Sequence, residues 1–278
     1  MTNTTTATAI RTVGVIGAGR MGQSIIGHVA RKGFTVAVHD IDEGKREAVA
    51  KLGAAWAESP MALARARDAI LVCVGYDQEL RQLMSADGLL RYLARGTIVA
   101  VLSTVNPRTV QELAEDAAAS GVHVVDSTVC RGARAADEGT LLSFVGGEAD
   151  VVKRLKPVLA CYSTDIIHTG GVGSAQVAKA ANNLVMWSCL IADHEALALA
   201  KRFGMDVDVL REALVKSSAG NYVLRHWGTN TMAWAEDDMD IALRMAGQVG
   251  IGLPQAGLNR ELCRTLKPKR FRLDEYGV

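Results

Sequence analysis

A glycine-rich turn near the start of the chain constrains its fold more than any other feature. The β-branched run from Thr12 to Ile16 leads directly into Gly17-Ala18-Gly19-Arg20-Met21-Gly22. After the turn, apolar residues recur at helical spacing, at Ile25, Ile26, Val29 and Ala30. Strand, tight turn and helix in this order are typical of the first βαβ unit of a doubly wound α/β fold.

The same alternation of strands and helices continues through the first half of the chain. Further short apolar runs predict strands over Thr35–His39, Ala69–Val74, Thr97–Leu102, His123–Asp126, Leu142–Val145 and Asp165–His168. The intervening segments have helical patterns, for example Pro107–Ser120 and Ala149–Leu159. We therefore expect an α/β Rossmann domain with a doubly wound, mostly parallel sheet over residues 11–173, preceded by a disordered leader over residues 1–10.

The pattern changes at Ser174. From there to Phe203 the chain contains neither Gly nor Pro, which predicts one helix about 45 Å long. Shorter helical segments follow over Val207–Lys216, Asp240–Gln248 and Pro254–Leu266. Residues 174–278 are thus expected to form an all-helical C-terminal domain, joined to the sheet by the long helix.

Composition and charge argue against several classes of partner. The chain has 31 Lys and Arg against 30 Asp and Glu, a net charge of +1, which provides no long-range attraction for nucleic acid or an anionic membrane. Its five cysteines are scattered without a C-x-x-C pair, and its six histidines lack metal-ligand spacing. We expect reduced thiols, no metal site and a cytoplasmic location.

The glycine turn predicts a dinucleotide site. Gly17 permits the tight turn, Gly19 lets a pyrophosphate approach the backbone, and Gly22 lets helix and strand pack. An acidic residue about twenty positions further on, Asp40, suits the ribose hydroxyls of NAD and disfavours NADP. Lys45 and Arg46 follow closely in sequence and are candidates to pair with the 2′-phosphate of NADP, so NADP stays possible as the cofactor. The cofactor set from this region is Gly17, Ala18, Gly19, Arg20, Met21, Gly22, Asp40 and Ile41.

Several spaced motifs together resemble the β-hydroxyacid dehydrogenase family, which includes 3-hydroxyisobutyrate dehydrogenase. They are the Met21-containing turn, Ser103-Thr104 followed by Pro107, the Asp126–Leu141 stretch, and the Gly170–Asn183 stretch with its K-x-x-N-N pattern. The resemblance implies that Val74, Gly75 and Thr104 line the cofactor and that Lys179 is the general acid/base. It also implies that Asn182, Asn183 and the loop residues Cys130, Arg131 and Gly132 hold the substrate.

Such a lysine suits the chemistry. When hydride leaves a carbinol carbon, the hydroxyl proton must leave as well, and reduction must return it. Lys179 and Asn183 are four residues apart on the long helix and therefore share one face.

The chain departs from the family pattern at three places. Val74-Gly75 replaces a usual Leu-Pro, Cys130 and Arg131 replace a serine and a glycine in the substrate loop, and Asp237 stands where a lysine is usual. Arg131 either grips a carboxylate or sulfonate of an extra-anionic substrate or folds outward over the loop, and sulfolactaldehyde reductases also carry an arginine near this position.

The predicted function is an NAD(P)-dependent oxidoreductase that transfers a hydride between a nicotinamide cofactor and a small anionic 3-hydroxy acid or its semialdehyde. NAD is the expected cofactor, with NADP possible, and the expected assembly is a homodimer or homotetramer. Two alternatives stay open: an imine reductase-like enzyme that uses NADP, which the presence of Lys179 disfavours, and a cofactor-binding protein without turnover.

Overall fold

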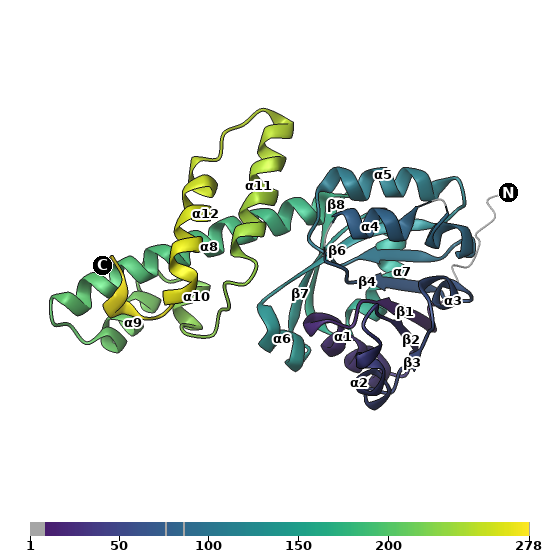
Figure 1. The fold of residues 1–278 in the computed structure, drawn as a ribbon, viewed down its shortest axis with the longest axis horizontal. Helices are drawn as coiled ribbons and strands as arrows, with labels where there is room; N and C mark the ends of the chain where they lie inside the picture. Colours follow the sequence, from purple (N-terminus) through teal and green to yellow (C-terminus); the bar gives the residue numbers. More distant parts are fainter. Residues whose placement is uncertain (1–8, 76, 86, 278) are drawn as a thin grey trace. The chain divides into compact units, whose positions relative to one another are not determined.

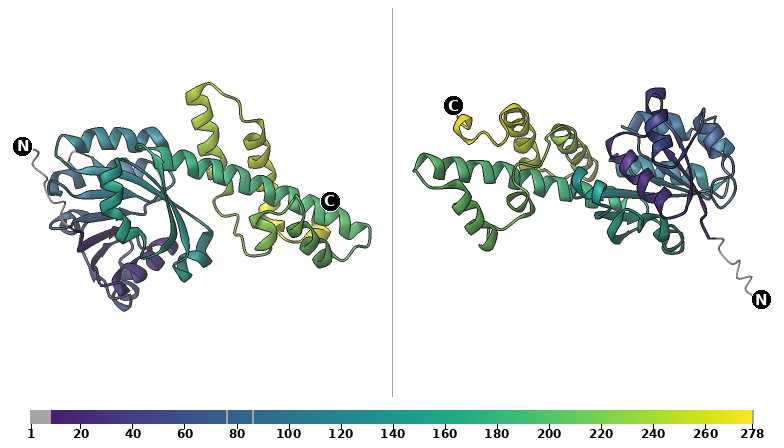
Figure 2. Two further views of the ribbon diagram at one scale, coloured as in Figure 1. Left: turned by 180° about the vertical axis from the view of Figure 1, so that it is seen from behind. Right: turned by 90° about the horizontal axis from the view of Figure 1, so that it is seen from below.

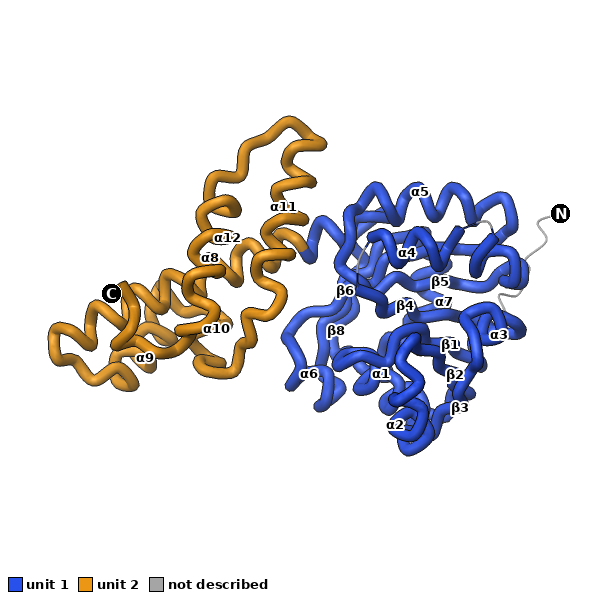
Figure 3. Tube along the Cα trace, viewed as in Figure 1, with its two compact units in different colours: residues 1–179 blue, residues 180–278 orange. Residues whose placement is uncertain are grey.

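The structure consists of two compact units. The computed structural model describes residues 9–75, 77–85 and 87–277, and the division falls between Lys179 and Ala180 (Figure 3). Within the described residues, no helix combines the length and apolar character needed to cross a bilayer.

The first unit is built on one eight-stranded sheet. The strands are β1 Thr12–Ile16, β2 Thr35–His39, β3 Ala55–Trp56, β4 Ala69–Val72, β5 Ile98–Val101, β6 His123–Cys130, β7 Leu141–Gly146 and β8 Ser163–Gly170. Their order is β3-β2-β1-β4-β5-β6-β7-β8, and every neighbouring pair is parallel except β6 and β7. The predicted doubly wound, mostly parallel sheet is therefore confirmed.

Helices cover both faces of this sheet (Figures 1 and 2). One core includes side chains of α1 Arg20–Arg31, α2 Arg46–Lys51, α6 Gly132–Glu138 and α7 Ala149–Leu159. The other includes α3 Pro60–Ala64, α4 Asp77–Met84 and α5 Pro107–Ala118. Successive strand residues alternate between the cores: Leu71 lies in the first, whereas Ile70 and Val72 lie in the second. Because β1, β4 and β5 are buried on both faces, they read as continuous apolar runs.

The strand and helix bounds agree with the predicted ranges where the hydrophobic pattern clearly marks both ends of the element. β1, β2 and α7 coincide with their predicted ranges. β6, in contrast, continues four residues beyond the predicted end at Asp126. Ser127 and Thr128 are fully buried, so the strand continues through polar residues that the apolar pattern did not include.

The expected disordered leader over residues 1–10 overlaps the described chain at residues 9 and 10. Residues 1–8 lie outside the described part of the chain, but Ile10 is only 9% exposed and belongs to the first core. Burial of its apolar side chain is favourable because it removes apolar surface from water.

A long helix, α8 Ser174–Arg202, begins in the first unit and ends in the second. It was expected over Ser174–Phe203, with the domain boundary at 173/174. The compact units instead divide after Lys179, because the first turns of α8 are hydrogen-bonded to β6. Gly173 and Gln176 donate their N–H groups to Asp126, and Thr128 donates its hydroxyl to the carbonyl of Ala175.

Helices are the only regular secondary structure among the described residues of the second unit, as predicted. After α8 come α9 Val207–Lys216, α10 Tyr222–Arg225, α11 Ala235–Val249 and α12 Pro254–Leu266. Short 3₁₀ turns occur at Glu43–Lys45 and Leu89–Tyr92 in the first unit and at Lys267–Lys269 and Leu273–Glu275 in the second. Helix α11 begins five residues before the predicted Asp240, and its first turn carries Glu236, Asp237 and Asp238, which the positive end of the helix dipole favours.

Two adjacent titratable residues of α8 are buried in the second unit. The ring of His194 packs against Trp227 and Phe271, and its Nε2 accepts the Phe271 N–H at 3.0 Å. The Asp193 Oδ1 atom accepts a hydrogen bond from the Asn221 amide at 3.0 Å. Burial lowers the pKa of His194 to about 4 and raises the pKa of Asp193 to about 6.

These two shifts oppose each other in their effect on stability. His194 binds its proton more readily in the unfolded chain, so its contribution is lost as pH falls from 6.5 toward 4. Asp193 binds its proton more readily in the folded chain, so its contribution is lost as pH rises from about 4 to 6.

We predict that Asp193→Asn leaves the His194 contribution to the pH dependence of stability without the opposing contribution of Asp193. The amide oxygen still accepts the Asn221 bond, and the free energy of unfolding at pH 7.5 should rise by about 1–3 kcal/mol because no buried charge remains. Between pH 6.5 and 4 the variant should lose stability more steeply than the parent. Denaturant unfolding across that range measures both effects, and parallel pH curves for parent and variant would contradict the prediction.

Candidate active site

The cofactor residues predicted from sequence gather at one edge of the sheet. The strand order reverses between β1 and β4, and ligands of such sheets bind where the carboxyl ends of the strands diverge. Backbone bonds tie the loops that follow these strands: Gly17 N donates to His39 O at 2.9 Å, and Cys73 N donates to Ile16 O at 2.8 Å. The glycine turn and the loop after β4 therefore meet at this switch point.

The glycine turn has the geometry needed for a pyrophosphate. Gly17 has φ +99°, and a Cβ there would lie 2.4 Å from the carbonyl oxygen of Cys73. A Cβ on Gly22 would lie 2.2 Å from the carbonyl oxygen of Gly17, whereas one on Gly19 would meet nothing within 4 Å. Gly19 is the N-cap of α1, and no described side chain caps that helix. The open side at Gly19 and the uncapped helix start fit a dinucleotide.

Asp40 stands at the end of β2, and its carboxylate is already hydrogen-bonded. It is 7% exposed and accepts the N–H groups of Ala18 at 2.6 Å and Asp42 at 2.9 Å. Lys45 Nζ lies 3.0 Å from both of its oxygens. Burial acts to raise the pKa of Asp40, but the two amide bonds and the Lys45 ammonium hold it below its ordinary value. Asp40 is therefore ionised and largely neutralised by Lys45.

The other residues predicted around the turn differ in exposure. Ile41 is 95% exposed beside Asp40, and Met21 is half-buried against the first core. Arg20 forms an ion pair with Asp137 of α6. That pair joins the glycine-turn helix to the segment that was predicted to hold the substrate.

The loops after β4 and β5 are linked by a side chain. Ser103 donates its hydroxyl to the carbonyl oxygen of Val74 at 2.7 Å, and Gly75 donates its N–H to Glu79 at 2.8 Å. Thr104, next in the chain, is half-buried. Val74, Gly75 and Thr104 thus lie on two connected loops at the switch-point edge.

Lys179 lies against the end of β6. Its Nζ donates to the carbonyl oxygen of Val129 at 2.8 Å and lies 3.9 Å from the sulfur of Cys130. The side chain is half-buried. The predicted acid/base and the start of the predicted substrate loop are therefore in contact, although about fifty residues separate them in sequence.

Two buried residues that sequence reasoning did not assign hold this part of α8 in place. Asp126 accepts the N–H groups of Gly173 at 2.8 Å and Gln176 at 2.9 Å. Burial raises the pKa of Asp126, although these N–H groups act to lower it. The Gln176 side chain bonds to Ser103 and Val105 of the loop after β5. Asp126 ends a predicted strand and opens the Asp126–Leu141 motif, and Gln176 lies within the Gly170–Asn183 motif, but neither pattern indicated a bond between the two residues.

The predicted substrate loop has a non-glycine residue at a position where the backbone is left-handed. Arg131 has φ +84° and precedes Gly132 with φ +75°. A non-glycine residue in this region is strained. The Arg131 guanidinium pairs with Asp165 of β8 at 2.7 Å and donates to the carbonyl oxygen of Thr140 at 3.0 Å, and these bonds offset the strain.

Asn182 and Asn183 belong to the second unit, further along α8. Asn183 is 2% exposed, and its side-chain oxygen accepts a hydrogen bond from Asn182 at 3.1 Å. Trp187, one turn on, is buried in the core of that unit and donates to Asp238 at 2.9 Å.

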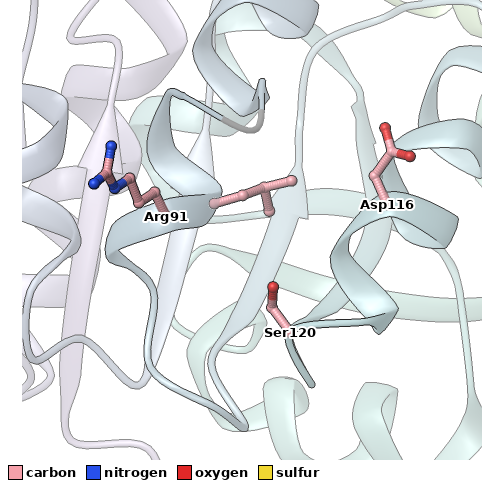
Figure 4. Close-up of a pocket in the computed structure, with 4 residues that line it drawn as sticks. Arg91, Asp116 and Ser120 are labelled. Carbon is pink, nitrogen blue, oxygen red and sulfur yellow. The ribbon is translucent and has the colours of Figure 1, made fainter.

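A separate surface pocket of about 340 Å³ has no part in this site. Leu90, Arg91, Asp116 and Ser120 line it (Figure 4). These residues precede β5 and β6 in the chain, so the pocket lies toward the amino ends of the parallel strands, opposite the switch-point edge. Among the residues that the structure describes, no group of His, Cys, Asp and Glu side chains has the arrangement of a metal site.

We predict that two glycines of the turn respond differently to alanine. Gly22→Ala should lower the melting temperature by several degrees, because its methyl group would displace α1 from Gly17. Gly19→Ala should leave the melting temperature within about 2 °C of the parent, because the new methyl group meets open space. Both should weaken dinucleotide binding, measured by calorimetry; unchanged affinity in Gly19→Ala would argue against pyrophosphate approach there.

Comparison with known proteins agrees with this geometry. Residues 12–171 match the family described as the NAD binding domain of 6-phosphogluconate dehydrogenase. Residues 173–274 match the NAD-binding family of NADP-dependent 3-hydroxyisobutyrate dehydrogenase. The chain is 32% identical over 213 residues to 3-hydroxyisobutyrate dehydrogenase of Pseudomonas aeruginosa, covering 76% of this chain and 72% of that one.

Solved structures share the fold. Mycobacterium tuberculosis 3-hydroxyisobutyrate dehydrogenase with L-serine aligns with a TM-score of 0.85 at 23% identity, covering 94% of this chain and 95% of that one. A structure of Psf3 in complex with NADP+ and 2-OPP aligns with a TM-score of 0.82 at 26% identity, covering 92% and 94%. The sequence-predicted family and cofactor class are confirmed: the chain belongs to the β-hydroxyacid dehydrogenase family and is an NAD(P)-dependent oxidoreductase that acts on CH–OH groups.

Proposed function

We propose that the chain interconverts a short 3-hydroxy acid and its semialdehyde, with Lys179 as general acid/base. The observation that carries this proposal is the position of Lys179 Nζ, 2.8 Å from the Val129 carbonyl oxygen and beside Cys130. The amine thus lies where the predicted substrate loop begins, on a helix whose first turn is bonded to the loop after β5.

The reaction balances with one proton carrier. The nicotinamide supplies the hydride acceptor in oxidation and the hydride donor in reduction. In oxidation the hydroxyl proton passes to the uncharged Lys179 amine as the carbonyl forms, and in reduction the ammonium returns it to the alkoxide oxygen. The Val129 carbonyl accepts one N–H of the Lys179 side chain and so fixes the direction in which the nitrogen points.

The geometry of Arg131 favours a substrate with one anionic group. Asp165 already balances the Arg131 guanidinium, so this side chain does not provide an uncompensated charge for a second anion. We propose that a single carboxylate is held by the turn at Arg131 and Gly132. The substrate-binding role expected for Asn182 and Asn183 stays a prediction. 3-Hydroxyisobutyrate and L-serine, named for the similar proteins, are the first compounds to test.

We predict that Lys179→Ala lowers kcat by about 10²- to 10⁴-fold, the usual effect of losing a general acid/base. Reduced nicotinamide absorbance measures turnover on a panel of 3-hydroxy acids, semialdehydes and imines, with NAD and with NADP. Cofactor affinity should persist, because the turn and Asp40 are untouched. Lys153→Ala, an exposed lysine of α7, is the matched control and should retain full activity.

The alternatives give different results in the same assay. An imine reductase would turn over imines better than hydroxy acids, and a binding protein without turnover would bind the cofactor but act on none of the panel. Equal activity of Lys179→Ala and the parent would exclude Lys179 as the acid/base.

We propose further that NAD is the preferred cofactor and that Lys45 makes NADP acceptable. Asp40 repels a 2′-phosphate, but Lys45 stands within 3.0 Å of both its oxygens and offsets that charge. We predict that Lys45→Met lowers kcat/KM with NADP about tenfold relative to NAD, a change worth one charge-assisted hydrogen bond. Lys51→Met, which removes a pair with exposed Glu47, is the control and should leave the ratio unchanged.

We also propose that the chain forms a homodimer or homotetramer through its second unit. Most of the large apolar side chains that are exposed in the described chain belong to the second unit. They are Val185, Leu199, Phe203, Met205, Val209, Tyr222, Trp234, Val249, Ile251 and Leu258. Exposed apolar side chains in such numbers favour an interface. Sedimentation velocity tests the assembly, and a monomer at micromolar concentration would contradict it.

A cytoplasmic location is proposed on the cysteine pattern alone. The five cysteines are scattered along the chain and include no C-x-x-C pair, as suits a reducing compartment. Fractionation of cells that produce the protein, with activity found only outside the cytoplasm, would contradict this location.

A further inference from the structure

The side chain of Gln176 links the acid/base helix to the loop after β5. It is 1% exposed. Its Oε1 accepts the N–H of Val105 at 3.0 Å, and its Nε2 donates to the carbonyl oxygen of Ser103 at 2.9 Å. Both ends of one amide therefore bond to the backbone on either side of Thr104.

The loop that Gln176 holds is itself tied to the loop after β4. Ser103 donates its hydroxyl to the carbonyl oxygen of Val74 at 2.7 Å. A continuous series of bonds thus runs from Val74 through Ser103 to Gln176. These are the loops on which the cofactor-lining residues Val74, Gly75 and Thr104 were predicted.

The backbone of Gln176 is fixed as firmly as its side chain. Its N–H donates to Asp126 Oδ2 at 2.9 Å, and Gly173 N donates to Oδ1 of the same carboxylate at 2.8 Å. The preceding residue, Ala175, accepts the Thr128 hydroxyl at 3.0 Å. The first turn of α8 is thereby attached to β6.

Lys179 lies three residues after Gln176, and residues three apart are neighbours on a helix surface. Any displacement of the first turn of α8 from the Ser103–Val105 loop therefore moves Lys179 Nζ relative to that loop. Hydride and proton transfer depend on such distances, and an error of about 1 Å costs about 10²-fold in rate.

We propose that Gln176 is a positioning residue that sets the separation between the Ser103–Val105 loop and the Lys179 amine. The inference rests on the proposed acid/base role of Lys179. Gln176 contacts the backbone of the cofactor loop and not the reacting atoms, so it acts through Thr104 and Lys179.

Two variants test the proposal. Gln176→Met keeps the length of the side chain but removes both hydrogen bonds, and kcat should fall about 10- to 100-fold. The primary deuterium isotope effect on kcat, with substrate labelled at the transferred hydrogen, should rise, because hydride transfer becomes slower relative to product release. The dissociation constant of NADH should change by less than about threefold, because the glycine turn and Asp40 are untouched.

Gln176→Glu gives a second, pH-dependent readout. When protonated, a glutamic acid accepts from Val105 and donates to Ser103, which restores both bonds; when ionised, it repels the Ser103 carbonyl. The ratio of its kcat to that of the parent should therefore rise as pH falls, while the ratio for Gln176→Met stays flat. The pH dependence of the Gln176→Glu ratio remains decisive if the methionine variant does not fold.

Asn259→Leu is the matched control. Asn259 is a fully buried amide of the second unit that bonds to Gln255 and Ser188. Loss of the Asn259 amide should lower the melting temperature while the isotope effect stays at the parent value. This result would separate a general loss of stability from misplacement of the Lys179 amine.

The outcomes are distinguishable. If the parent turns over hydroxy acids and Gln176→Met keeps its kcat and isotope effect, Gln176 is only structural and the positioning proposal fails alone. If the ratio of the Gln176→Glu kcat to the parent kcat stays constant across pH, the proposal fails as well. If the parent shows no turnover, the proposed function fails and this inference falls with it.

Discussion

The buried carboxylate of Asp126 is the interaction on which the candidate active site depends. A helix begins with backbone N–H groups that have no partner within the helix, and α8 begins beside the core of the first unit. Asp126 lies on β6 and accepts two of these N–H groups, from Gly173 and Gln176. Its negative charge also suits the positive end of the helix dipole. Together with the Thr128 and Gln176 bonds, this contact holds the first turn of α8 against the sheet and so defines the position of Lys179.

Most of the remaining site is organised by the backbone. Parallel strands bring the loops after β1, β4 and β5 to one edge, and hydrogen bonds between neighbouring strand ends keep them together. Side chains add a few specific links, such as Ser103 to Val74 and Lys45 to Asp40. The sheet therefore fixes the general location of the chemistry, while these links set distances and charge.

The sequence predicted the parts of this structure that depend on local patterns. Apolar runs located β1 and β2, and the absence of Gly and Pro located α8 to within one residue. The Lys179 position was predicted by a motif, and its contact with Cys130 follows from the fold. What the sequence did not indicate were the bonds between distant residues. Gln176 reaches a loop more than seventy positions away, and only the three-dimensional fold brings the two together.

Other errors have similar physical causes. β6 extends through Ser127 and Thr128, which are polar but fully buried, so an apolar pattern stops too early. Arg131 adopts a backbone conformation that usually requires glycine, and its cost is offset by Asp165 on a strand that follows much later. In each case a tertiary contact overrides the local preference of the chain.

The reversal of direction between β6 and β7 has a consequence for how such an enzyme changes its substrate. An antiparallel neighbour begins at the edge where the previous strand ends, so the connection needs no crossover over the sheet. The seven-residue helix α6 fills that short connection, and of its residues only Ala135 and Ala136 are buried. Insertions and replacements in this segment can therefore change the surface between β6 and β7 while the sheet register and the glycine turn after β1 stay intact. Selectivity can diversify in evolution without a new fold or a new cofactor.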